Sequence, residues 1–121
     1  DAAFASLIRD LKRHNLLSST VVVCGGEFGR TPKINNLGGR DHWPTGFSML
    51  VAGGGFAGGR VIGATDPEGV KKDPEKPVFV EDLHATVLDL FGIDYAKELM
   101  TPVGRPMALS KGDVVEELLA M

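Results

Sequence analysis

The chain reads TVVVCGGEFGR over residues 20–30, where an unbroken apolar run ends in two glycines and a charged turn. Consecutive β-branched residues are typical of a strand buried on both faces of a sheet. A second apolar run over residues 47–52 predicts a neighbouring buried strand. Because the connection between the two runs is short and has no predicted crossover helix, we expect antiparallel pairing. The single cysteine, Cys24, lies in the first run and is expected to pack in the core.

Helical periodicity flanks these two strands. Apolar residues at positions 4, 7, 8 and 11 predict an amphipathic helix over residues 2–14, packed on one face of the sheet. A second helix is predicted to begin at Asp82 and to end at Gly92, a C′ glycine. We also expect a more exposed strand over residues 60–64, a helical turn over residues 95–100 and a terminal helix over residues 114–121. This order of elements predicts an α/β fold, with residues 1–121 as a single unit.

Composition narrows the classes of function. The 121 residues are 43% hydrophobic and 24% charged with a net charge of −3, which is typical of a globular protein and argues against nucleic-acid binding. No segment approaches the ~20 apolar residues of a membrane-spanning helix, so no membrane span is predicted. One cysteine excludes an internal disulfide and a cysteine-built zinc site. No serine lies in a G-x-S-x-G turn, so the catalytic residues stay unknown.

The polar loop after the first strand carries the candidate chemistry, in the motifs GGEFGRTP at residues 25–32 and GRDHWP at residues 39–44. Glu27, Asp41 and His42 offer oxygen and nitrogen ligands for a divalent metal: zinc, manganese, magnesium or calcium. Arg30 and Arg40 offer forked donors for a phosphate or sulfate. Since ligand sites collect at the carboxyl ends of strands in α/β sheets, we expect Glu27, Arg30 and His42 to converge there. A polar loop with a structural Asp–His pair is the alternative that these residues leave open.

The stretch VEDLHATVLDLFGI at residues 80–93 resembles a helix near the end of alkaline phosphatases, sulfatases and cofactor-independent phosphoglycerate mutases. The motifs GEFGRTP at residues 26–32 and GRDHWP at residues 39–44, together with GATD at residues 63–66 and GRP at residues 104–106, resemble one family more closely. This is the domain-of-unknown-function family numbered 1501, within the alkaline phosphatase and sulfatase-like clan. The resemblance implies the C-terminal portion of an alkaline phosphatase-like three-layer sandwich with a mixed sheet, in a longer protein that is exported by the twin-arginine route to the periplasm. It also implies metal-dependent hydrolysis of a small anionic ester, either a phosphate or a sulfate.

One position departs from the pattern of the catalytic relatives, in which Asp-His-Gly follows this strand and both the Asp and the His bind metal. Glu27, Phe28 and Gly29 stand in those places, so the acidic ligand is changed to a residue that can still bind metal and the histidine ligand is lost. His42 matches a later metal-binding histidine of those relatives, and Asp41 is expected either to bind the metal or to orient His42.

Three functions therefore stand as expectations. The first is a metal-dependent ester hydrolase, incomplete as an isolated fragment, and the second is a non-catalytic binding or structural protein with a degraded site. The third is an autonomous small binding domain. For the first two we expect an exposed strand edge or apolar face, covered by an upstream segment or by a second copy of the chain.

Overall fold

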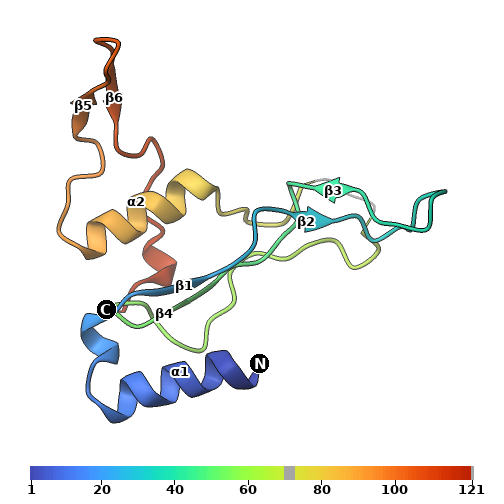
Figure 1. The fold of residues 1–121 in the computed structure, drawn as a ribbon, viewed down its shortest axis with the longest axis horizontal. Helices are drawn as coiled ribbons and strands as arrows, with labels where there is room; N and C mark the ends of the chain where they lie inside the picture. Colours follow the sequence, from blue (N-terminus) through green and yellow to red (C-terminus); the bar gives the residue numbers. More distant parts are fainter. Residues whose placement is uncertain (70–72, 121) are drawn as a thin grey trace.

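The chain has a mixed α/β fold with small antiparallel sheets, described by a computed structural model over residues 1–69 and 73–120 (Figure 1). The predicted α/β class is thereby confirmed. The elements in chain order are α1 (Ala2–Arg13), η1 (Leu17–Ser19), β1 (Val22–Cys24), β2 (Gly29–Arg30), β3 (His42–Trp43), β4 (Leu50–Ala52), α2 (Val80–Leu90), β5 (Glu98–Met100), β6 (Pro106–Ala108) and η2 (Glu116–Leu118). The strands pair as β1–β4, β2–β3 and β5–β6.

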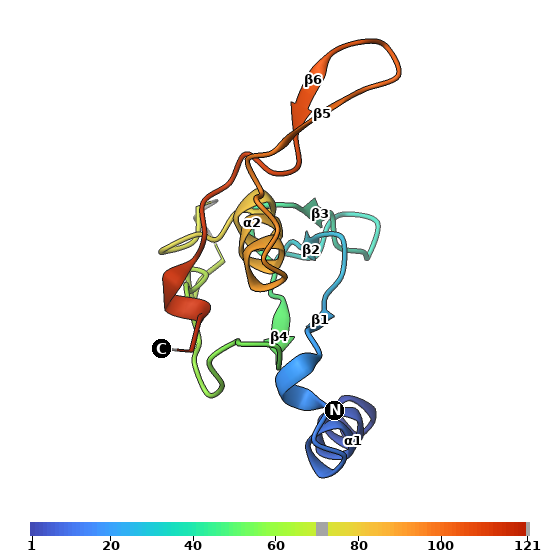
Figure 2. The ribbon, with the colours of Figure 1, turned by 90° about the vertical axis from the view of Figure 1, so that its left-hand side faces the viewer.

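β1 and β4 pair antiparallel in the register Val23↔Val51, which confirms the predicted pairing of the two apolar runs. α1 and α2 lie on opposite sides of this pair in both ribbon views (Figures 1 and 2). The prediction that the strands are buried is wrong, because Val23 is 43% exposed, Leu50 is 54% exposed and Cys24 is exposed as well. Within the described residues no third strand joins β1 or β4, so both outer edges of the pair stay open.

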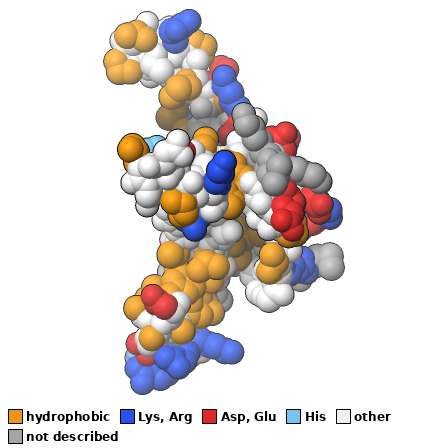
Figure 3. Space-filling view, turned by 90° about the vertical axis from the view of Figure 1, so that its right-hand side faces the viewer, with side chains coloured by type: hydrophobic (Ala, Val, Ile, Leu, Met, Phe, Trp, Pro, Cys, Tyr) orange, Lys and Arg blue, Asp and Glu red, His pale blue; other side chains and the backbone are white. Residues whose placement is uncertain are grey.

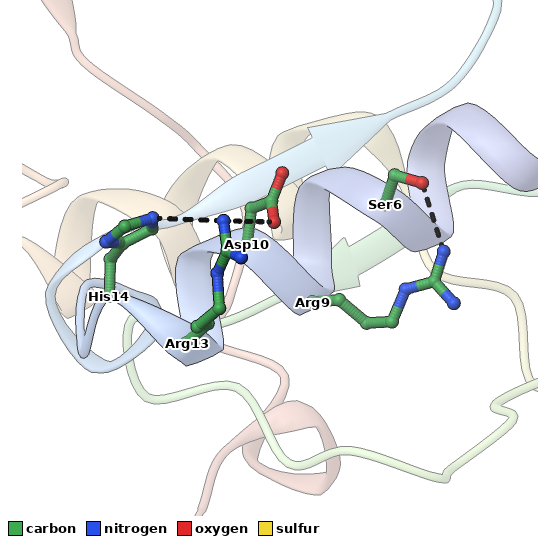
Figure 4. A network of polar contacts seen from close by, with 5 residues as sticks. All are labelled: Ser6, Arg9, Asp10, Arg13 and His14. Atoms are coloured by element: carbon green, nitrogen blue, oxygen red, sulfur yellow. Dashed lines mark hydrogen bonds and ion pairs between the residues drawn. The ribbon is translucent and has the colours of Figure 1, made fainter.

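α1 confirms the helix predicted over residues 2–14, and it ends one residue earlier, at Arg13. The Asp1 carboxylate caps its first turn by accepting two backbone N–H groups. None of the helix residues is fully buried, so the apolar side of α1 is only partly covered. The polar side carries a network of hydrogen bonds and one ion pair (Figure 4), formed by Ser6, Arg9, Asp10, Arg13 and His14.

The buried centre lies where the C-terminal segment, residues 110–120, crosses α2. Its buried side chains are Phe56, Ala85, Thr86 and Ser110. The Ser110 hydroxyl donates to the carbonyl oxygen of Glu81 at 2.7 Å, and further bonds to Asp82 and Thr86 follow along the segment. Backbone hydrogen bonds also join residues 118–120 to residues 55–57. The centre is therefore held by polar bonds around a small apolar nucleus.

α2 confirms the predicted second helix, although it begins two residues earlier, at Val80; it ends at Leu90, and Gly92 is the predicted C′ glycine. Gly92 has a φ of +69°, a left-handed conformation that favours glycine. The Gly92 N–H donates to the Asp89 carbonyl oxygen at 2.8 Å, and the Ile93 N–H donates to the Leu88 carbonyl oxygen at 2.9 Å. This pair of bonds is the Schellman motif, which satisfies the last carbonyl groups of the helix.

Three predicted elements in the second half of the chain are wrong. Residues 60–64 form no strand, apart from one isolated bridge at Ala64. Residues 95–100 hold a turn followed by β5, and the predicted terminal helix is the short 3₁₀ turn η2, with Met121 outside the described residues. Hydrogen bonds between distant parts of the chain replace local ones here, as between the Ser110 N–H and the Tyr95 carbonyl oxygen. The spacing of apolar residues in a short window cannot predict hydrogen bonds between distant segments.

The solvent-accessible surface of the molecule is much larger than that of a compact monomer of the same mass. Its accessible area is 9105 Å², whereas a compact monomer of 12.9 kDa exposes about 6,300 Å². Hydrophobic side chains are visible at the α1 end and on the β5–β6 hairpin, which projects from the body (Figures 1 and 3). Over all the described residues, the large hydrophobic side chains with the highest exposed fraction are Leu37, Val61, Val103 and Met100. Among the described helices, none is long and apolar enough to cross a membrane.

Candidate functional site

The segment that carries both sequence motifs folds into a hairpin arm, residues 27–46, which extends away from β1 and β4 (Figure 1). Its strands β2 and β3 pair antiparallel in the register Gly29↔Trp43 and Arg30↔His42. Gly29 lies so close to the carbonyl oxygen of Gly46 that a Cβ atom at this position would collide with it. The predicted polar loop is thus a structured hairpin, and glycine is required where its two ends meet.

Arg30 and His42 lie opposite each other in this hairpin, so their side chains share one face of the arm. Phe28 contacts both of them. Its ring centroid is 4.1 Å from that of His42, with the planes tilted by 39°, and 4.7 Å from the guanidinium carbon of Arg30. Arg30 and His42 are exposed and Phe28 is half-buried. The face therefore presents a guanidinium and an imidazole to solvent, both held against one aromatic ring.

The two arginines of the motifs have different environments. Among the described residues, the Arg30 side chain has one hydrogen bond, a long one of 3.4 Å to the carbonyl oxygen of Gly29, and no carboxylate pairs with it. Arg40, in contrast, donates from Nη1 to the carbonyl oxygen of Thr31 at 2.8 Å and also to that of Pro32. Arg40 thus ties the backbone of the arm together, whereas the guanidinium of Arg30 is open to an external anion.

Asn35 organises the tip of the arm. Its Oδ1 accepts hydrogen bonds from the backbone N–H groups of Leu37 and Gly39, both at 3.0 Å, and its Nδ2 donates to Oδ1 of Asp41 at 2.9 Å. The Asp41 N–H in turn donates to Oγ1 of Thr31 at 3.0 Å. A shallow depression of about 320 Å³ lies beside this network, lined by Thr31, Lys33, Ile34, Asn35, Asn36 and Asp41. The tip is therefore ordered by its own side chains.

The predicted metal ligands all lie on the arm, but two of them, Asp41 and His42, already contact other side chains. Glu27 is exposed in the turn before β2, His42 contacts Phe28, and one carboxylate oxygen of Asp41 accepts from Asn35. Within residues 1–69 and 73–120, no three His, Cys, Asp or Glu side chains come together closely enough to hold a metal ion. The donor types suit a divalent metal, but a metal centre needs more ligands than the arm gathers. The metal site stays a prediction, and no chemical step is assigned to it.

Sequence reasoning missed the roles of Phe28 and Asn35. From the sequence, Phe28 was interpreted only as the loss of a metal-binding histidine. Its spacing of two residues from Arg30 nevertheless places both side chains on one face of an extended chain. Asn35 precedes Asn-Leu-Gly-Gly, and asparagine before glycines is typical of a turn closed by the amide side chain. Both signals were present in the sequence and would have predicted a hairpin instead of a loop.

The comparisons with known proteins add a family but no characterised relative. The model of the family described as "Protein of unknown function (DUF1501)" matches residues 1–119, which includes the arm, α2 and most of the C-terminal segment that crosses it. Searches of curated proteins and of solved structures give no match. Since the match covers nearly the whole length, the chain belongs to the DUF1501 family of proteins of unknown function.

Proposed function

We propose that this chain supplies the oxyanion-binding part of a hydrolase-like site for phosphate or sulfate esters. One observation carries the proposal: Arg30 and His42 lie side by side on the exposed face of the arm, with Phe28 against both. The close approach of Gly29 to Gly46 and the Asn35 network order the backbone of the arm, so the two side chains project from an ordered base.

Arg30 fits the role because of its charge and its freedom. A guanidinium is charged at every physiological pH and presents several N–H donors in a plane that matches two oxygens of a phosphate or sulfate. No carboxylate among the described residues neutralises Arg30, so an incoming anion does not have to displace an ion pair. Arg40 contributes less directly, since its Nη1 already serves two backbone carbonyl groups.

His42 would add a second function beside Arg30. Hydrolysis of an ester moves negative charge onto the oxygens around phosphorus or sulfur and onto the leaving oxygen. A guanidinium stabilises the first kind of charge, and a protonated imidazole nitrogen can donate a proton to the leaving oxygen. The nucleophile is not among the residues that the arm brings together, so the proposal assigns only binding and proton donation to this chain.

The second candidate is a non-catalytic protein that binds anions with the same arm. Two observations favour it. The described residues gather no three-ligand metal cluster, and Phe28 stands where the resemblance expects a metal-binding histidine. In this case Arg30 and His42 would bind the oxyanion without turning it over, and the divalent metal of the first candidate would be absent.

The fold forms part of the same proposal. We place β1 and β4 within the mixed sheet of an alkaline phosphatase-like three-layer sandwich, whose remaining polypeptide covers their free edges. The helices on opposite sides of the pair support this, as does a surface excess of about 2,800 Å², the area of an extensive interface. Hydrogen exchange tests it: a strand paired on both edges protects every amide of residues 22–24, whereas a bare hairpin protects alternate amides.

Anion binding and hydrolysis are measured separately to test the function. The protein is titrated with inorganic phosphate and with sulfate at constant ionic strength, while the Arg30 and His42 side-chain resonances are followed by NMR. Arg30→Ala is expected to weaken binding by at least about tenfold, the value of a charge-assisted hydrogen bond. Arg105→Ala is the matched control, because Arg105 is an exposed arginine on the distant β5–β6 hairpin (Figure 1).

Hydrolysis is assayed with p-nitrophenyl phosphate and p-nitrophenyl sulfate, without metal and with zinc, manganese, magnesium or calcium, and the metal content of the purified protein is determined. Turnover that falls in both Arg30→Ala and His42→Ala supports the hydrolase. Binding without turnover, in a protein free of metal, selects the non-catalytic candidate. If neither phosphate nor sulfate binds better to the protein than to Arg30→Ala, both candidates are wrong.

A further inference from the structure

We infer that Phe28 is a positioning residue of the oxyanion site: its ring holds the guanidinium of Arg30 and the imidazole of His42 in the arrangement that receives the anion. This inference rests on the proposed function above and adds to it the residue that orders the two donors. It also gives a role to the aromatic side chain at the position where a histidine ligand is missing.

The geometry of the arm supports this role. Arg30 and His42 are directly opposite across the hairpin, and Phe28 is two residues before Arg30, so His42 is its diagonal neighbour on the same face. The ring is 4.1 Å from the imidazole centroid and 4.7 Å from the guanidinium carbon. A guanidinium within about 6 Å of a ring centroid is attracted by the negative face of the ring. The ring is therefore a common support for both donors.

Within residues 1–69 and 73–120, no other contact of comparable strength fixes Arg30. Its one hydrogen bond is the 3.4 Å contact with the carbonyl oxygen of Gly29, the residue next to it in the chain. A long exposed arginine with so few contacts would otherwise sample many rotamers, and this freedom would be lost on binding an anion. Contact with Phe28 restricts the guanidinium before the anion arrives.

The ring is not explained by packing alone. Phe28 is only half-buried, and the buried centre of the molecule, around Thr86 and Ser110, does not include it. Its described ring contacts are with Arg30 and His42, the two side chains proposed to bind the anion. An aromatic residue held at the surface against two potential donors is suited to orienting them.

The test uses fluorinated phenylalanines at position 28. Successive fluorination of the ring weakens its negative face and keeps its shape nearly unchanged, so folding and packing stay constant while the cation–π attraction declines. Affinity for inorganic phosphate is expected to fall stepwise with the number of fluorines, by about two- to fivefold in all, the range of an exposed cation–π contact. Phe28→Tyr, which keeps the ring face, should retain the affinity, and Phe28→Leu, which removes the ring, should weaken binding at least as much as the most fluorinated ring.

The outcomes separate this inference from the proposed function. If Arg30→Ala weakens phosphate binding but the fluorinated series and Phe28→Leu bind phosphate as the unchanged protein does, the role of Phe28 is wrong and the anion site stands. If Arg30→Ala has no effect, the anion site itself is wrong. Amide resonances of residues 29, 30, 42 and 43 report whether the hairpin is intact in every variant. A fluorinated series with constant affinity in an intact hairpin overturns the inference.

Discussion

The backbone N–H of Val115 donates to the hydroxyl oxygen of Thr86 at 2.9 Å, which joins the C-terminal segment to the middle of α2. Thr86 has no exposed surface, and its own hydroxyl proton goes to the carbonyl oxygen of Asp82 at 2.7 Å. A single hydroxyl therefore satisfies a backbone donor and a backbone acceptor in the buried centre.

Thr86→Val tests this hydroxyl. The substitution keeps the shape of the side chain but leaves the Val115 N–H without an acceptor, so we expect the free energy of unfolding to fall by about 1–3 kcal/mol in urea denaturation. Thr86→Ser is the matched control, since it keeps the hydroxyl and removes a methyl group. A valine variant that is as stable as the serine variant would contradict the importance of the bond.

The end of α2 gives a prediction about backbone conformation alone. Gly92 has a left-handed φ of +69°, and a Cβ atom there would meet no neighbour within 4 Å. Gly92→Ala should therefore lower the free energy of unfolding by about 1–2 kcal/mol, the cost of a left-handed conformation for a residue with a Cβ. Gly26→Ala has equal space and no left-handed φ, so it should be near neutral. Equal destabilisation of the two variants would refute this account.

The tip of the arm is expected to depend on Asn35 and not on its neighbour. Asn35→Ala removes the acceptor for the N–H groups of Leu37 and Gly39, so these two amides should exchange with solvent at least about fivefold faster. Asn36→Ala should leave their exchange unchanged, because Asn36 makes no hydrogen bond within the described residues. Hydrogen exchange followed by NMR distinguishes the two variants, and equal rates in both would contradict the proposed network.

Gly29 is predicted to be essential for the structure of the arm, whereas the rest of the fold should not depend on it. A Cβ atom at Gly29 would collide with the carbonyl oxygen of Gly46, so Gly29→Ala should separate the ends of the hairpin. Phosphate binding is expected to be lost, while the melting temperature changes little because the buried centre lies elsewhere. Gly39→Ala, whose Cβ would make only an ordinary contact of 3.7 Å with Asn35, should bind phosphate normally. Loss of binding in both variants would remove the special role of Gly29.

The sequence predicted best those elements whose bonds are local. α1, α2 and the glycine after α2 follow from spacing and capping over a few neighbouring residues. The β1–β4 pairing is not local, and its antiparallel sense was predicted because no crossover helix separates the two apolar runs. Burial of β1 was not predictable, because burial depends on what covers a strand and not on the strand itself. The strand pattern of Val23 and Cys24 is that of a sheet interior, yet both are exposed here.

The candidate site was predicted in its residue types and less well in its shape. Glu27, Arg30 and His42 were expected to converge at the end of the sheet. The structure places Arg30 and His42 opposite each other in the hairpin, and the convergence of Glu27 with them stays a prediction. What brings them together is the close approach of Gly29 to Gly46, a contact across 17 positions of chain that no periodicity indicates. Arg40 could not be separated from Arg30 by sequence, because both are arginines beside glycines and only their partners differ.

The way the C-terminal segment closes the buried centre bears on how the chain is made. Residues 118–120 bond to residues 55–57, and Ser110 and Val115 bond to α2, so the centre lacks its second half until those residues have left the ribosome. α1 and the turn after it need only nearby residues and can form early. Synthesis therefore leaves Phe56 and the inner side of α2 uncovered until residues 110–120 are available, and a nascent chain that ends before residue 110 presents that surface to chaperones and proteases.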